Sequence, residues 1–205
     1  MAHKCEEQLM ADLLKVPLAP HTLPFYYTSS DYFGPYNVKI GRNKQMERYG
    51  VIFTCLNTRA FHLELAVDLS TMAFMQVLRR FFSIRGQPAL MMSDNGSKMI
   101  GAADSGKLRE VIEGWDVDKL KKFCAEKRIQ WKFVTPAAPH QNGCVESLVK
   151  TYKKALKGAI GDKVLTPFEL YTCLMEVGNL VNQRPIDHFR MTRLTVRTYV
   201  QMTSR

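Results

Sequence analysis

Three β-forming segments follow one another in the first third of the chain, and they constrain its fold more than any other feature. In the last of them, residues 61–67, apolar and polar side chains alternate with the two-residue period of a β-strand. Aromatic and β-branched residues predict the two earlier strands, at 25–33 and 49–56. We expect the first strand to end at Gly34-Pro35. Because the connections are short, the three strands should form an antiparallel meander.

The rest of the chain alternates between helical and strand patterns. Ser70 can cap a helix whose apolar residues recur at helical spacing as far as Phe82, and Gly86 should end it. The remaining predicted elements are a strand at 88–93, helical character over 107–127, a strand at 129–134, a loop at 135–142 and helices at 143–160 and 167–181. This order predicts a mixed sheet with helices on its faces.

The positive charge of the chain is unevenly distributed. Lysine and arginine number 29 against 19 acidic residues, and residues 121–160 alone hold nine basic and two acidic residues, a local net charge of +7. Concentrated positive charge indicates a nucleic-acid-binding protein, although a solvated basic surface would have the same composition. No apolar stretch is long enough to cross a bilayer, and no secretory signal is evident. We therefore expect no membrane partner.

Three carboxylates occupy positions that indicate a metal-binding or catalytic role. Asp31 lies within an aromatic strand that should be buried, where an unpaired carboxylate is costly. Asp94 follows the strand at 88–93, although Asp-Asn-Gly is also ordinary turn chemistry. Glu146 lies early in a helix, where an i,i+4 pair with Lys150 is a structural alternative. Two aspartates and one glutamate on separate elements suit divalent metals, and two such ions can clamp the reacting oxygens of a phosphodiester.

Two other acidic residues, Glu64 and Asp68, are rivals for this role. Glu64 lies on the polar face of the alternating strand, and Asp68 is placed to cap the helix that follows. We therefore leave both out of the predicted site.

The helix at 143–160 also carries a lysine stripe. Lys150, Lys153 and Lys157 fall within about 40° of the direction of Glu146 when each residue turns the helix by about 100°. Such a stripe can hold a nucleic-acid backbone. The opposite side of the helix is expected to face the core, and its apolar residues are Leu148, Tyr152, Ala155, Leu156 and Ala159.

Six stretches, taken in chain order, form a more specific pattern. They are Asp31-Tyr32-Phe33-Gly34-Pro35, Tyr49-Gly50-Val51-Ile52-Phe53-Thr54-Cys55, His62-Leu63-Glu64-Leu65, Ser93-Asp94-Asn95-Gly96-Ser97, Pro136-Ala137-Ala138-Pro139-His140-Gln141-Asn142-Gly143-Cys144-Val145-Glu146 and Val181-Asn182-Gln183-Arg184-Pro185. In these residues the chain resembles the integrase catalytic core of retroviruses and long-terminal-repeat retrotransposons, most closely the Bel/Pao type. The 51 residues between Asp94 and Glu146 resemble the longer spacing of that type.

The resemblance implies an α/β fold of the ribonuclease-H-like class, a five-stranded mixed sheet of order 3-2-1-4-5 flanked by helices. It places the catalytic core at 25–185, a connector segment at 1–24, and a divergent tail that reads like a frame-shifted sequence at 186–205.

The resemblance also maps the family's D,D,E triad onto Asp31, Asp94 and Glu146, as catalytic residues and as ligands of two Mg²⁺ or Mn²⁺ ions. Asp31 and Asp94 would stand side by side on neighbouring strands, and Glu146 would reach them from its helix. Gln141 and Asn142 would belong to a loop that touches the DNA end.

The implied function is a polynucleotidyl transferase for DNA integration, which nicks the element's DNA end and joins the freed 3′-hydroxyl to target DNA. The expected partners are both DNAs and further copies of the chain in a homo-oligomer, and the expected location is intracellular, with action in the nucleus. Two alternatives stay open. One is a catalytically inactive nucleic-acid-binding remnant of a retroelement, and the other is a ribonuclease-H-like nuclease that hydrolyses strands without joining them.

Overall fold

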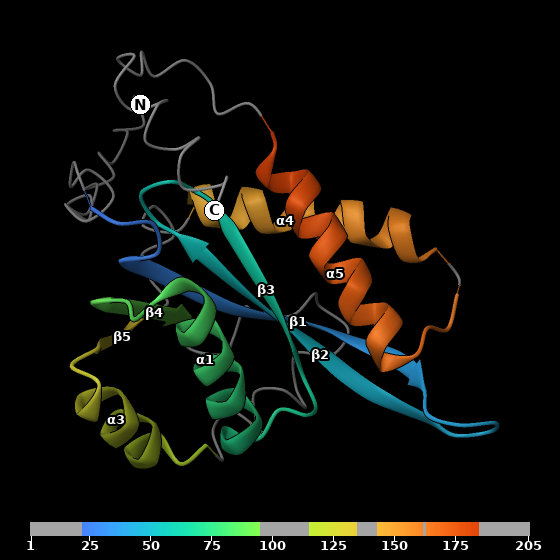
Figure 1. Cartoon of the computed structure of the whole chain (residues 1–205), viewed down its shortest axis with the longest axis horizontal. Helices are drawn as coiled ribbons and strands as arrows, with labels where there is room; N and C mark the ends of the chain where they lie inside the picture. The colour runs from blue at the N-terminus through green and yellow to red at the C-terminus, as the bar shows by residue number, and fades with distance from the viewer. Residues whose placement is uncertain (1–21, 95–114, 135–142, 162, 185–205) are drawn as a thin grey trace, which may run out of the picture.

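A computed structural model of the chain describes residues 22–94, 115–134, 143–161 and 163–184. Most of the predicted connector and all of the predicted tail lie outside these ranges. Five strands form one mixed sheet of order β3-β2-β1-β4-β5, in which β1 is antiparallel to β2 and parallel to β4 (Figure 1). The strands are β1 (Tyr27–Lys39), β2 (Gln45–Cys55), β3 (Phe61–Ala66), β4 (Leu90–Asp94) and β5 (Gln130–Val134). The predicted fold class and strand order are confirmed.

Helices cover both faces of this sheet (Figure 1). On one face lie α1 (Thr71–Arg85) and α3 (Val117–Glu126), and on the other lie α4 (Gly143–Ile160) and α5 (Pro167–Asn182). The side chain of Ser70 accepts a hydrogen bond from the backbone N–H of Ala73, so the predicted cap of α1 is confirmed. The predicted helical stretch at 107–127 is described only from residue 115 onward.

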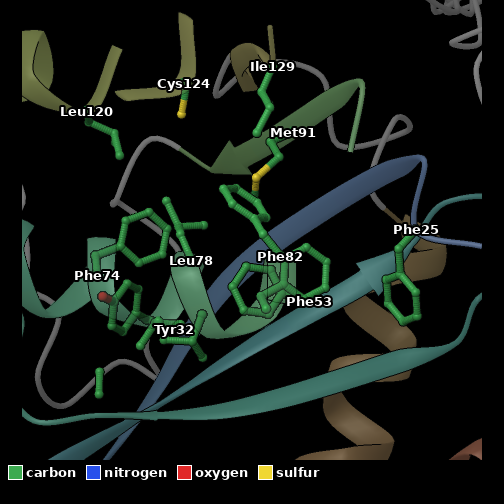
Figure 2. Close-up of a cluster of buried hydrophobic side chains, with 14 of the residues drawn as sticks. Phe25, Tyr32, Phe53, Phe74, Leu78, Phe82, Met91, Leu120, Cys124 and Ile129 are labelled. Carbon is green, nitrogen blue, oxygen red and sulfur yellow. The ribbon is translucent and has the colours of Figure 1, made fainter. Parts of the chain in front are cut away.

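The core between the sheet and α1 is rich in aromatic side chains. The rings of Phe53 and Phe81 stack with their centroids 4.1 Å apart, and Phe74 stacks on Trp115 at 4.9 Å. Figure 2 shows Met91 of β4 among these side chains, and the α3 residues that close the cluster. Each large apolar side chain buried in this way contributes about 1.5–3 kcal/mol, so this core ties α1 firmly to the sheet.

Strand β1 continues through Gly34-Pro35, so the prediction that it ends there is wrong. Two residues separate Phe33 from Tyr36, whereas one residue separates their partners on β2, which makes this point a β-bulge. Gly34 supplies the positive φ of 113° that the bulge requires. The extra residue brings Phe33 and Tyr36 to the same face of the sheet, with their rings 6.0 Å apart. The bulge therefore lets β1 and β2 extend as a long hairpin (Figure 1).

The stretch that starts at Val181 ties the end of α5 to the edge strand β3. The Asn182 side chain accepts a hydrogen bond from the backbone N–H of Phe61 at 2.7 Å and donates one to the Phe61 carbonyl at 2.9 Å. The guanidinium of Arg184 lies 5.1 Å from the centre of the Phe61 ring and donates to the carbonyl of Arg59. This part of the family-like pattern therefore has an architectural role.

Gly50 provides a direct test of the packing between β1 and β2. It lies opposite Phe33, and a Cβ added to it would overlap the Phe33 ring. We expect Gly50→Ala to lower the free energy of unfolding by about 1–3 kcal/mol, measured by urea denaturation, because the buried ring must move.

Gly158→Ala is the matched control, because a Cβ at this position on α4 meets open space. It should raise the free energy of unfolding by about 0.5–1 kcal/mol through helix propensity. Effects of the same sign for the two variants would contradict this description of the sheet.

Candidate metal and nucleic-acid site

Asp31 and Asp94 occupy corresponding positions on neighbouring parallel strands. The pairing of β1 with β4 runs in register up to Ser30 and Ser93, and Asp31 and Asp94 are the next residues of the two strands. Neighbouring strands lie about 4.8 Å apart, so the two backbones are adjacent here. This is the side-by-side placement that the resemblance implied.

The side chain of Asp31 faces the α4–α5 side of the sheet. Its partner on β2 is Ile52, which belongs to the core beneath α4 and α5, as does Phe33 two residues further along β1. Asp31 is half-buried, and its Oδ1 atom is shielded from solvent. Because burial penalises a carboxylate's charge unless a cation or hydrogen bonds offset it, this is a suitable environment for a metal ligand.

Neighbouring contacts hold the end of β4, and with it the backbone of Asp94. The indole N–H of Trp131 on β5 donates a 2.9 Å hydrogen bond to the Ser93 hydroxyl. The Trp131 ring meets Phe74 of α1 edge to face at 5.7 Å, and Asp94 itself pairs with Val134. Asp94 is therefore placed at the carboxyl end of a parallel strand pair, where ligands commonly bind in open α/β sheets.

Helix α4 runs in the same general direction as β1, which places Glu146 toward the Asp31 end of that strand. The Tyr152 ring of α4 packs against Phe33 with a centroid distance of 5.3 Å. Beyond the helix, the carbonyl of Leu165 accepts a hydrogen bond from the backbone N–H of Lys39 at the far end of β1. Glu146 and Asp31 therefore both precede the contact between Tyr152 and Phe33 along their elements.

The tyrosines of this interface are packing groups. Burial raises the pKa of Tyr36 to about 12, with a smaller contribution in the same direction from the nearby Cys173 thiol. Burial also raises the pKa of Tyr152, with smaller contributions from Tyr36 and Cys173. Both phenols are consequently neutral at physiological pH.

The lysines of α4 face solvent, but its core side differs from the prediction. Lys150 and Lys157 are exposed and Lys153 is half-buried. The buried residues of the described part of the helix are Val149, Tyr152 and Leu156. Ala159, predicted to face the core, is exposed. The core direction therefore lies about 90° from Glu146, not opposite it, because Val149 packs inward where the sequence pattern favoured the alanines.

Glu64 lies on the polar face of β3, as predicted, and this face is buried. It is fully shielded from solvent beneath α1, and its carboxylate accepts a 2.6 Å hydrogen bond from Nε of Arg80 and lies 3.1 Å from His62 Nε2. The polar face of β3 is polar because it holds this ion pair. The arginines of the following helix were the sequence signal for such a partner.

The predicted metal ligands lie only partly within the described structure. Among the side chains described, no three His, Cys, Asp or Glu residues are grouped to hold a metal. The side chains of Asp94 and Glu146 lie outside that set, as do the predicted DNA-contacting residues Gln141 and Asn142. The predicted set consists of carboxylates alone, and these hard oxygen donors fit Mg²⁺ or Mn²⁺. No helix of the described chain is long and apolar enough to span a bilayer.

Three solved structures share this architecture. The BIV integrase catalytic core domain matches with a TM-score of 0.56 and 13% identity, over 87% of this chain and 97% of that one. The HTLV-2 integrase catalytic core domain in complex with magnesium, in its dimeric form, matches with a TM-score of 0.51 and 16% identity, over 84% of this chain and 95% of that one. A simian T-cell lymphotropic virus intasome, in complex with PP2A regulatory subunit B56 gamma, matches with a TM-score of 0.57 and 16% identity, over 84% of this chain and 54% of the matched chain.

These similarities establish the fold of retroviral integrase catalytic cores. The chain spans about half the length of the matched intasome chain. No protein-family model matches the sequence, and no curated protein matches it significantly. Since the identities are low, what the site does must be argued from its own residues.

The buried ion pair at Glu64 can be tested separately from the predicted metal site. Glu64→Gln should lower the free energy of unfolding by about 1–3 kcal/mol in urea denaturation, because it leaves Arg80 and His62 without their buried charged partner. The loss should stay below that of a fully buried pair, since 43% of the Arg80 side chain is exposed.

Asp68→Asn is the control for this substitution. Asp68 is exposed, and its side-chain oxygen caps the backbone N–H of Ser70, a role that asparagine also performs. We expect a change within about 0.5 kcal/mol. Equal small losses for the two variants would show that the Glu64 pair contributes little to stability.

Proposed function

We propose that this chain is the catalytic core of a retroelement integrase, a metal-dependent polynucleotidyl transferase of the Bel/Pao type that processes and joins DNA ends. The observation that carries the proposal is the register of β1 and β4, which puts Asp31 beside Asp94 at the centre of an integrase-like sheet. Helix α4 starts with Glu146 in its first turns and packs on the same face toward which Asp31 points.

In this mechanism Asp31, Asp94 and Glu146 hold two Mg²⁺ or Mn²⁺ ions. When bound, the ions supply activation of the attacking hydroxyl and stabilisation of charge on the phosphate. The three carboxylates come from separate elements, and the two cores of the sheet fix the backbones that carry them. The HTLV-2 core, solved with magnesium, supports this choice of ion.

The lysines of α4 provide a surface for the DNA backbone. Lys150 and Lys157 are exposed on the helix that carries Glu146, and the part of the stripe from Lys150 to Lys157 extends about 10 Å along it. A duplex lying on this stripe would place a phosphate near the carboxylates. We further propose that the chain works as a homo-oligomer on DNA in the nucleus, and the dimeric form of the HTLV-2 core supports the first part.

The catalytic assignment predicts metal-dependent strand cutting and joining on a branched DNA substrate in Mn²⁺. Asp31→Asn, Asp94→Asn and Glu146→Gln should each abolish the activity, and calorimetry should show loss of Mn²⁺ binding in Asp31→Asn. Asp118→Asn, at an exposed acid in the first turn of α3, is the control and should retain both properties.

The products of the same assay separate the alternatives. Strand joining yields longer strands, whereas a nuclease of the same fold yields only shorter ones. Salt-sensitive DNA binding without any Mn²⁺ binding would identify a catalytically inactive remnant. Retention of activity by Asp94→Asn would overturn the triad.

The lysine stripe predicts a separate effect on affinity. Changing Lys150, Lys153 and Lys157 to Gln should weaken binding similarly for any DNA sequence, and should lower the slope of log K against log salt by about one unit per lysine. Fluorescence anisotropy over a salt series measures both. The control, Lys119, Lys121 and Lys122 on α3 changed to Gln, removes the same charge from the opposite face of the sheet. An unchanged slope in the α4 variant would remove the stripe from the DNA path.

A further inference from the structure

A basic pocket lies at the tip of the β1–β2 hairpin, away from the three carboxylates. It is an open pocket with a volume of about 430 Å³. Its lining residues come from the end of β1, the hairpin turn, the start of β2 and the segment between α4 and α5, and they are Lys39, Arg42, Asn43, Lys44, Gln45 and Val164. The pocket therefore joins parts of the chain that are more than a hundred residues apart.

Backbone hydrogen bonds hold the walls of this pocket together. The N–H of Lys39 donates to the carbonyl of Leu165 at 2.9 Å, which fastens the hairpin to the segment after α4. The N–H of Ile40 donates to the carbonyl of Lys44 at 2.7 Å and closes the turn, in which Gly41 has a φ of 89°. These bonds fix the backbone that carries the three basic side chains.

The chemistry of the lining selects an anion. Lys39, Arg42 and Lys44 are exposed cations, and Asn43 and Gln45 add amide donors. Within the described ranges, no carboxylate lines the pocket or forms an ion pair with these three cations. An arginine fork and two lysine ammonium groups match the oxygens of phosphate. Among the described residues of the lining, Val164 is the only apolar one, which leaves little for a peptide side chain to anchor on.

We propose that this pocket binds backbone phosphates of the nucleic acid on which the chain acts, as a contact point separate from the carboxylates. The identity of the ligand as nucleic acid rests on the proposed function. Lys39 lies eight residues after Asp31 on β1, a span of at most about 26 Å. That length corresponds to about eight base pairs of duplex DNA.

The lysine stripe of α4 connects the two ends of this span. The helix begins toward the Asp31 end of β1, exposes Lys150 and Lys157, and leads into the segment whose Val164 lines the pocket. DNA lying along the stripe would thus reach the hairpin tip. The pocket adds three positive charges to the basic surface. These charges come from residues outside the lysine-rich region at 121–160.

The test compares the chain with its Lys39→Gln, Arg42→Gln, Lys44→Gln triple variant on a duplex of about 20 base pairs, which exceeds the span. Fluorescence anisotropy over a salt series should give weaker binding, and a log–log salt slope lower by about 0.9 for each phosphate that the variant no longer neutralises. The α3 triple variant removes the same charge elsewhere and should leave the slope within error of the unmodified chain. Urea denaturation checks that the triple variant folds. If the triple variant does not fold, the single Arg42→Gln variant is used instead, with an expected decrease of about one unit in the salt slope.

The outcomes distinguish this proposal from the proposed function. If the hairpin variant keeps the full slope while Asp31-dependent cutting is present, the pocket proposal is wrong and the catalytic one stands. If the unmodified chain neither cuts nor binds DNA, both are wrong. Calorimetry with inorganic phosphate and with polyglutamate identifies the other ligand sources. Binding of either that is abolished in the hairpin variant, with DNA affinity unchanged, would overturn the assignment to nucleic acid.

Discussion

Strand β1 is the shared wall of two hydrophobic cores, and the arrangement of the rest of the domain depends on it. Tyr32 enters the core under α1 and α3, whereas Phe33 enters the core under α4 and α5. Because β1 pairs with β2 on one side and β4 on the other, neither core can shift without moving the strand. The position of Asp31, directly before these two side chains, is therefore held by packing on both faces of the sheet.

Burial on both faces also explains why two acidic residues of the sheet have different roles. Glu64 is fully buried and is compensated by Arg80 and His62, and the bond to Arg80 links β3 to α1. A fully enclosed carboxylate needs partners from its own chain, whereas Asp31 is half-buried and lies beside the carboxyl end of β4, the edge at which ligands commonly bind in open α/β sheets. The environment, not the residue type, separates the structural acid from the proposed catalytic one.

The two proposals draw on three features of the molecule. Strand register places the backbones of Asp31 and Asp94 side by side, and the exposed side of α4 carries Lys150 and Lys157. The hairpin pocket exists because a β-bulge lets β1 extend beyond Gly34. Likeness to integrase cores at 13–16% identity describes the architecture only. Many chemistries occur on one fold, so the charge pattern and the register carry the functional argument.

The sequence by itself determined the features that depend on neighbouring residues. The alternation at 61–67, the Ser70 cap and the helical stretches at 143–160 and 167–181 are local patterns of period and hydrogen bonding, and the structure contains them nearly as predicted. The strand order and the placement of Asp31 beside Asp94 came from resemblance to a family, since no local pattern reports which strands become neighbours.

Only the tertiary structure decided the remaining features. They are the continuation of β1 through Gly34-Pro35, the burial of Glu64, the burial of Val149 in place of Ala159, and the pocket that Lys39 and Val164 line together. Each of these features depends on the side chains that another strand or helix packs against the residue. A one-dimensional pattern gives the spacing of side chains but not the surface they meet, because that surface is formed by residues distant in the chain.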